Sequence, residues 1–453
     1  MSTFVPEPHL LESPRGRAWP QPPGTGPARP SSPAPPTTAA AVIVGAGPAG
    51  LAAASALWHL GVRDVVVLDR NGRPCGRFLD RIDTLKQRVL RSPYQHHPGV
   101  EGYRDCELLD FARLHWARLT ETERREIRMA QSGHRSVVPV DVFEAYCRHV
   151  AALHHVDART WRATARRVTP GPDHVTVSGP GFTVTAPYAI LCLGEERRDA
   201  PAHWTDGAPL PDGVGYWDEP VPDGGESLVV VGAGLSAAHL VSNGLAAGRS
   251  VHWILRAAAE RYQCADVNAS FFRAEGRARF DGTSWADRQQ LMRAQRRASV
   301  MFEFRPLFQQ AEADGRLTVH RGREVRELTA VAGGGAAVLL ADGTRIAGDH
   351  VALALGTTVS TGEALLGAGP AAVRDGWPDL DERTLAYRNA PRVLAVGAAA
   401  GMVLGPAARN IDGHRVATAR VAATVAAGLE GRTLPQPARV PAAERYEAAV
   451  VHA

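Results

Sequence analysis

This chain of 453 residues has few cysteines, almost no lysine and no dense basic block, and these absences exclude several classes of protein. Lys86 is the only lysine among 51 basic residues, and the net charge is only +4, so a nucleic-acid partner is not expected. The five cysteines are far apart and include no CxxC pair, which excludes a zinc ribbon and a thioredoxin-type dithiol. An odd cysteine count without a secretion signal indicates a cytoplasmic location.

The chain also lacks a long apolar run and a set of metal ligands. A membrane span needs about 18 uninterrupted apolar residues, and the nearest candidate, 39–61, is interrupted by glycines and by Pro48. Adjacent histidines occur at 96–97 and 154–155, but neighbours on a strand point to opposite faces and cannot share one metal. We therefore expect neither a membrane partner nor a metal site.

What is present is the composition of a protein with a real core. Hydrophobic residues make up 45% and charged residues 22% of the chain, as in ordinary globular domains. At about 150 residues per domain, the length corresponds to two or three domains. The first 38 residues contain eleven prolines, and we predict that this segment is a disordered, solvated tail.

The clearest pattern is a strand, a glycine-rich turn and a helix that occurs twice. In the first copy, Gly-Ala-Gly-Pro-Ala-Gly at 45–50 follows an apolar strand, and the next strand ends at Asp69. In the second copy, Gly-Ala-Gly-Leu-Ser-Ala at 232–237 follows an apolar strand, and the next strand ends at Arg256. The recurrence predicts two βαβ units of the dinucleotide-binding type.

The residues that close the two units differ and predict different cofactors. In such a unit the first glycine allows a tight turn, the second lets the backbone approach a pyrophosphate, and the third allows close packing. Asp69 can accept hydrogen bonds from ribose hydroxyls, whereas Arg256 can pair with a 2′-phosphate. FAD beside NADPH is the most economical combination. The residues expected to hold them here are Gly45, Gly47, Pro48, Ala49, Gly50, Asp69, Gly232, Gly234, Ser236 and Arg256.

These two units resemble those of the two-dinucleotide-domain flavoproteins, specifically the NADPH-dependent flavin monooxygenases, which include N-hydroxylases and Baeyer–Villiger enzymes. The resemblance covers about residues 40–430. It implies an α/β fold in which an FAD-binding domain with a Rossmann-like core carries an inserted, Rossmann-like NADPH-binding domain. The implied divisions are a tail over 1–38, the FAD domain over 39–200, the NADPH domain over 201–357, and the rest of the FAD domain with a C-terminal tail over 358–453.

The resemblance also implies residues around the flavin. Four further cofactor-binding positions are Arg70, Arg77, Val168 and Gly397. Three residues are expected beside the reacting ring, namely Arg91, Arg409 and Asn410. Relatives commonly carry an aspartate that bonds the ribityl chain after the last strand, but Ala398 occupies that position here. The histidine fingerprint of Baeyer–Villiger enzymes is also missing, which counts against that assignment.

By this resemblance the protein is expected to be a monooxygenase with a small-molecule substrate and dioxygen as its partners. NADPH would reduce FAD, and a flavin peroxide would then hydroxylate nitrogen or sulfur in the substrate. One alternative is an NADPH-dependent reductase or oxidase without oxygen insertion. Another alternative is a non-catalytic protein that senses NADPH. Ala398 is compatible with this alternative, because alanine at that position would weaken the retention of FAD. The identity of the substrate and the oligomeric state stay open.

Overall fold

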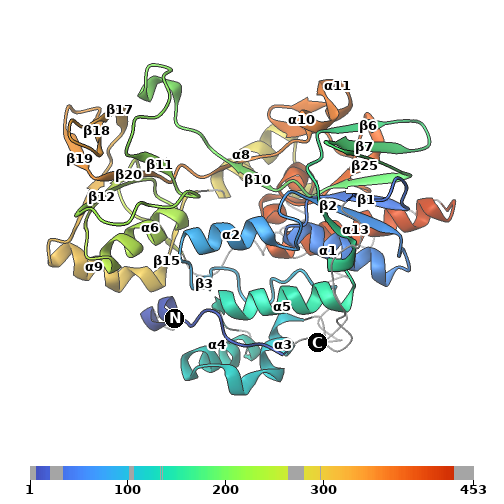
Figure 1. Ribbon diagram of the computed structural model, residues 1–453, viewed down its shortest axis with the longest axis horizontal. Helices are drawn as coiled ribbons and strands as arrows, with labels where there is room; N and C mark the ends of the chain where they lie inside the picture. The colour runs from blue at the N-terminus through green and yellow to red at the C-terminus, as the bar shows by residue number, and fades with distance from the viewer. Residues whose placement is uncertain are drawn as a thin grey trace.

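The chain folds into two lobes that lie side by side, with a layer of helices along one edge (Figure 1). The computed structural model describes residues 7–20, 34–100, 107–132, 134, 136–263, 280–295 and 297–432. Each lobe contains a parallel sheet with helices packed on it. The predicted α/β fold with two Rossmann-like domains is therefore confirmed.

The first lobe is built on a six-stranded sheet with the order β24-β25-β9-β1-β2-β5, in which only β24 is antiparallel to its neighbour. Apolar runs such as Ala-Val-Ile-Val form strands that are buried on both faces, as is usual in parallel sheets. The strands are β1 (Ala41–Val44), β2 (Val65–Asp69), β5 (Thr160–Arg162), β9 (Tyr188–Leu191), β24 (Ala386–Tyr387) and β25 (Ala390–Ala395).

Helices and a small sheet cover the six-stranded sheet. Helix α1 (Pro48–His59) packs against α13 (Ile411–Leu429) and α5 (Val140–Leu153). An antiparallel sheet of β6 (Arg167–Pro170), β7 (Val175–Gly179) and β8 (Phe182–Ala186) contacts β25, β9 and β1. The helical layer consists of α3 (Leu108–Leu114), α4 (Glu121–Gln131) and α5. Helix α2 (Gly76–Thr84) runs between the lobes (Figure 1).

The second lobe is built on a five-stranded parallel sheet with the order β11-β20-β12-β13-β16. Its strands are β11 (Val214–Tyr216), β12 (Ser227–Val231), β13 (Ser250–Leu255), β16 (Leu317–Arg321) and β20 (His350–Leu353). Helices α6 (Leu235–Ala246) and α9 (Arg305–Ala313) pack on it. The antiparallel strands β17 (Val325–Ala330), β18 (Ala336–Leu340) and β19 (Arg345–Gly348) cover the opposite side of the lobe.

The remaining elements are short, apart from α8 (Trp285–Gln295). They are β3 (Val89–Leu90), β4 (Val138–Pro139), β14 (Tyr262–Gln263), β15 (Val300–Met301), α10 (Glu363–Leu366), α11 (Ala368–Ala371), β22 (Val373–Arg374), β23 (Trp377–Pro378) and α12 (Gly401–Leu404). No helix within the described ranges combines the length and the apolar composition that crossing a bilayer requires.

Two passages of the chain between the lobes form one antiparallel ribbon. Strand β10 (Glu195–Arg197) leads from the first lobe to the second, and β21 (Thr357–Val359) leads back. The predicted boundaries at 200/201 and 357/358 fall at or close to this ribbon. These boundaries stay a prediction, and the two sheets support them because each draws its strands from the matching segments.

The N-terminal segment requires a correction. We expected residues 1–38 to be a solvated tail, but residues 7–20, which we call the N-terminal arm, pack against the protein. Leu10 is buried in the core of the second lobe. Arg17 lies between the carboxylates of Glu123 and Asp141, and the Trp19 indole also donates to Asp141 at 2.8 Å. The proline content of the segment did not predict this contact, which depends on a short 3-10 helix at Pro8–Glu12 and on a few anchoring side chains.

Candidate dinucleotide-binding cleft

The three glycines of the first loop have the three different roles that their spacing predicts. A Cβ at Gly45 would lie 2.4 Å from the Cys192 carbonyl oxygen, and the residue has a φ of +99°. A Cβ at Gly50 would lie 1.9 Å from the Gly45 carbonyl oxygen, so this glycine is needed for packing. A Cβ at Gly47 would have nothing within 4 Å, because this glycine faces an open cleft.

The second loop repeats this arrangement. Gly232 has a φ of +141°, and a Cβ there would lie 2.2 Å from the Ala354 carbonyl oxygen. Gly234 faces the cleft, with only the Ala298 Cβ, at 3.9 Å, near its open side. Each loop precedes a helix whose first N–H groups are available to an anion.

Both loops open into one cleft of about 2370 Å³ between the lobes. Most of the predicted cofactor residues line it, namely Gly45, Gly47, Pro48, Asp69, Arg70, Arg77, Gly232, Gly234, Ser236 and Arg256. Ala49 and Gly50 lie behind the wall, within helix α1. A single cleft that contains two dinucleotide-type loops can hold two nucleotides close to each other.

The two charged residues that close the βαβ units are held differently. The carboxylate of Asp69 accepts hydrogen bonds from the backbone N–H groups of Ala46 at 2.9 Å and Asn71 at 2.8 Å, which ties it to the first glycine loop. Arg256 is exposed and lines the cleft. Within the described part of the chain, no carboxylate forms an ion pair with Arg256, so its charge is available to a ligand.

Arg77 lines the cleft, but its guanidinium is already paired. Both terminal nitrogens donate to the carboxylate of Glu196 on β10, and this hydrogen bonding raises the pKa of Arg77. Burial, the largest single effect, opposes ionisation of Glu196, but the bond from Arg77 and the charges of the neighbouring guanidinium groups together lower the pKa of that carboxyl. The predicted cofactor contact of Arg77 therefore competes with a structural ion pair that the sequence did not reveal.

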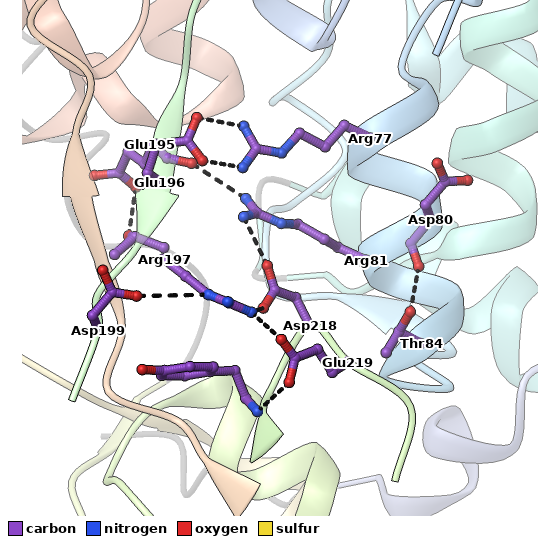
Figure 2. Close-up of polar contacts among 12 residues, drawn as sticks. Arg77, Asp80, Arg81, Thr84, Glu195, Glu196, Arg197, Asp199, Asp218 and Glu219 are labelled. Carbon is purple, nitrogen blue, oxygen red and sulfur yellow. Dashed lines mark hydrogen bonds and ion pairs between the residues drawn. The ribbon is translucent and has the colours of Figure 1, made fainter. Parts of the chain in front are cut away.

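This ion pair belongs to a network that joins the two lobes at the ribbon (Figure 2). Arg81 on α2 donates to Asp218 at 3.0 Å and lies over the ring of Trp217, 4.9 Å from its centroid. Arg197 on β10 donates to Asp218 at 3.3 Å and also pairs with Glu219. The network sets the orientation of the second lobe against α2, and none of its acidic members was predicted as a site residue.

Two residues predicted near the adenine and the flavin lie behind the cleft wall. Val168 on β6 is 1% exposed and packs in the core of the first lobe, whereas residues 163–166, just before β6, line the cleft. Gly397 adopts a φ of +88° after β25, and the adjacent Ala398 lines the cleft in its place. The alternation of side chains along a strand did not predict that residues 163–166 and Ala398 would face the cleft instead of Val168 and Gly397.

Of the three residues expected beside the reacting ring, two line the cleft. Arg91 donates to the Ser299 hydroxyl at 2.8 Å, and Arg409 donates to Glu195 at 2.7 Å. Asn410 instead precedes α13 as its N-cap residue and does not line the cleft. His414, one helical turn further on, does line it and was missed. Its four-residue spacing from Asn410 could have placed it on the same helical face.

Comparison with known proteins agrees with this architecture. The family model of an NAD(P)-binding Rossmann-like domain matches residues 43–106. The sequence has no match among curated proteins.

Three of the most similar solved structures are an ornithine hydroxylase, an ornithine N-hydroxylase and a cadaverine monooxygenase. The reduced ornithine hydroxylase of Pseudomonas aeruginosa has a TM-score of 0.70 and 17% identity, covering 86% of this chain and 100% of that one. An ornithine N-hydroxylase of Kutzneria sp. 744, described with reduced FAD, NADP⁺ and L-ornithine, has a TM-score of 0.67 and 17% identity, covering 86% and 99%. The FAD-bound cadaverine monooxygenase of Erwinia amylovora has a TM-score of 0.68 and 15% identity, covering 90% and 98%.

At these identities the likeness concerns the fold. It extends over nearly the whole length of each solved structure. The chain therefore has the fold of these three enzymes.

Proposed function

We propose that the protein is an FAD-dependent monooxygenase that uses NADPH and dioxygen to hydroxylate a small organic substrate. Nitrogen is our first choice of reacting atom and sulfur the second. The observation that carries the proposal is the single cleft into which both glycine loops open. The neighbouring structures described as an ornithine N-hydroxylase and a cadaverine monooxygenase support nitrogen. A cytoplasmic location, expected from the sequence, remains part of the proposal.

The residues of the first loop fit FAD. Gly47 leaves the space that a pyrophosphate needs, and the start of α1 presents N–H groups with a partial positive charge to it. Asp69 is held by two backbone donors, and each carboxylate oxygen can still accept from a ribose hydroxyl. The bound flavin would supply the hydride acceptor and the centre that reacts with oxygen.

The protein's own residues would position the reactants. Arg91, held by Ser299, and Arg409, held by Glu195, are two cations oriented at the cleft wall. Trp377 and Met292 both line the cleft. Their side chains pack against the first residue of α12, because a Cβ at Gly401 would lie 2.7 Å from Trp377 and 2.8 Å from Met292. These apolar side chains would limit the access of water to the reacting atoms.

Replacing Arg256 with glutamine is expected to weaken NADPH binding by about 10- to 100-fold, which corresponds to one charge-assisted hydrogen bond to a 2′-phosphate. NADH lacks that phosphate, so its binding should not change. The measurement is the dissociation constant of each nucleotide, with Arg316→Gln as a control because Arg316 lies on the same lobe outside the cleft. Equal weakening of NADPH and NADH would contradict the assignment of Arg256.

The proposal is tested by an absorbance time course. The FAD-loaded protein is reduced with NADPH under nitrogen and then mixed with aerated buffer. We expect rapid bleaching, followed by a transient spectrum that differs from both oxidised and reduced flavin. Direct return of oxidised flavin, with stoichiometric hydrogen peroxide in the presence of a panel of amines and thioethers, would favour a reductase or an oxidase. Absence of bleaching would overturn the hydride-donor role of the second site.

A further inference from the structure

His414 lies where the end of β25 and the start of α1 meet the cleft. Its backbone N–H donates to the Asn410 carbonyl at 3.0 Å, so the ring sits in the first turns of α13. A Cβ placed on Gly397 would lie 3.5 Å from Nε2 of His414 and 3.9 Å from the Ala49 Cβ. The imidazole therefore lies where the end of β25, the start of α1 and the first turns of α13 meet beside the first glycine loop.

The environment of the ring determines its chemical state. Burial is the largest effect and lowers the pKa of His414 to about 4, although the Arg409 backbone favours the proton. At neutral pH the ring is uncharged, with one nitrogen a donor and the other an acceptor. Nδ1 is buried and has no hydrogen-bond partner among the described residues, and the Arg409 backbone lies near the ring. A proton on Nδ1 would leave Nε2, the atom nearest Gly397, as a hydrogen-bond acceptor.

The charged groups of the wall near the ring are Glu195 and Arg409, which are hydrogen-bonded to each other at 2.7 Å. Pro48, Ala398 and Ile411 also line the cleft here, and none of their side chains can accept a hydrogen bond. A hydroxylated ligand segment passing this wall would lose its hydrogen bonds to water without replacing them, which is costly. Beside these three apolar residues, the imidazole is the side chain that can accept a hydrogen bond.

We propose that Nε2 of His414 accepts a hydrogen bond from a ribityl hydroxyl of bound FAD, and that it thereby replaces the acceptor that Ala398 cannot provide. The inference rests on the proposed function, because it requires FAD in the first site. It makes His414 a cofactor-positioning residue that would favour retention of FAD despite the alanine.

The test is the dissociation constant of FAD, measured by fluorescence titration of the apoprotein. We expect His414→Ala to bind FAD about 5- to 10-fold more weakly, as for one net hydrogen bond. His174→Ala is the control, since His174 is exposed in the turn between β6 and β7, away from the cleft. The melting temperatures of both apoproteins should match the wild type. Wild-type affinity in His414→Ala would overturn the inference.

A second variant distinguishes a hydrogen bond from a general effect on packing. Ala398→Asp should restore FAD affinity in the His414→Ala background, and should add little when His414 is present. An equal gain in both backgrounds would overturn the idea that the two positions serve one contact. If the wild-type protein binds no FAD at all, the proposed function itself fails, whereas the other adverse results remove only the role of His414.

Discussion

Replacing Arg17 with alanine will destabilise the protein by about 3–5 kcal/mol, because two buried carboxylates lose their cation. Nε of Arg17 donates to Asp141 at 2.7 Å, and Nη1 donates to Glu123 at 2.6 Å. These acidic side chains are 3% and 0% exposed, so neither can turn to water. Burial opposes the charge on Arg17, but the bonds to the two carboxylates outweigh burial and raise its pKa. Denaturant unfolding of the apoprotein measures the loss.

Two variants control this result. Arg73→Ala breaks an ion pair with Asp80 in which both side chains are about half exposed, and it should cost less than about 1 kcal/mol. Arg17→Lys keeps the charge but not the planar fork that reaches both carboxylates, and should fall between wild type and Arg17→Ala. Identical unfolding midpoints for Arg17→Ala and wild type would show that the N-terminal arm is solvated, as its prolines suggest.

Gly47→Ala and Gly50→Ala are expected to affect different properties: the first weakens FAD binding, and the second destabilises the fold. At Gly50 the new Cβ would lie 1.9 Å from a backbone oxygen, which forces the loop and α1 apart and destabilises the fold by about 3 kcal/mol or more. At Gly47 the backbone has a φ of −59° and a ψ of −176°, which alanine can adopt, and the Cβ meets no atom within 4 Å. Gly47→Ala should therefore fold normally, but its methyl group would fill the space of a pyrophosphate and weaken FAD binding about 100-fold or more.

Melting temperature and FAD affinity, measured on both variants, separate these effects. Gly234→Ala is the matched variant in the second loop, where the only neighbour of the new Cβ lies at 3.9 Å. It should weaken NADPH binding while leaving FAD binding unchanged. A Gly47→Ala protein that retains wild-type FAD affinity would contradict the placement of a pyrophosphate at the first loop, whatever its stability.

The glycine loops were predictable because their roles are local. Spacing within six residues determines which glycine turns the chain, which packs and which faces open space, and Gly45, Gly50 and Gly47 take those positions in the structure. The closing residues Asp69 and Arg256 were predictable for the same reason, since each follows a strand whose apolar run is visible in the sequence. A structural position can be predicted from the sequence where the groups that determine it are close along the chain.

The partners of the site residues were not predictable. Arg77 and Arg256 look alike in the sequence, yet Arg77 is paired with Glu196, 119 positions away, while Arg256 faces the cleft. Val168 and Gly397 each lie close to residues that line the cleft, but which neighbour faces the cleft beside a short strand depends on how the sheet is covered. Contacts between distant segments arise only when the elements pack together, so they cannot be predicted from a single sequence.

The sequence by itself determined the two-domain α/β fold and the positions of both dinucleotide loops, because strand runs, glycine spacing and helix starts are encoded within about thirty residues. Only the tertiary structure decided that both loops open into one cleft, that His414 meets the start of α1 beside Gly397, and that the N-terminal arm is held through Arg17. Each of these depends on segments more than 100 positions apart, which meet because two sheets and their covering helices bury their apolar faces together.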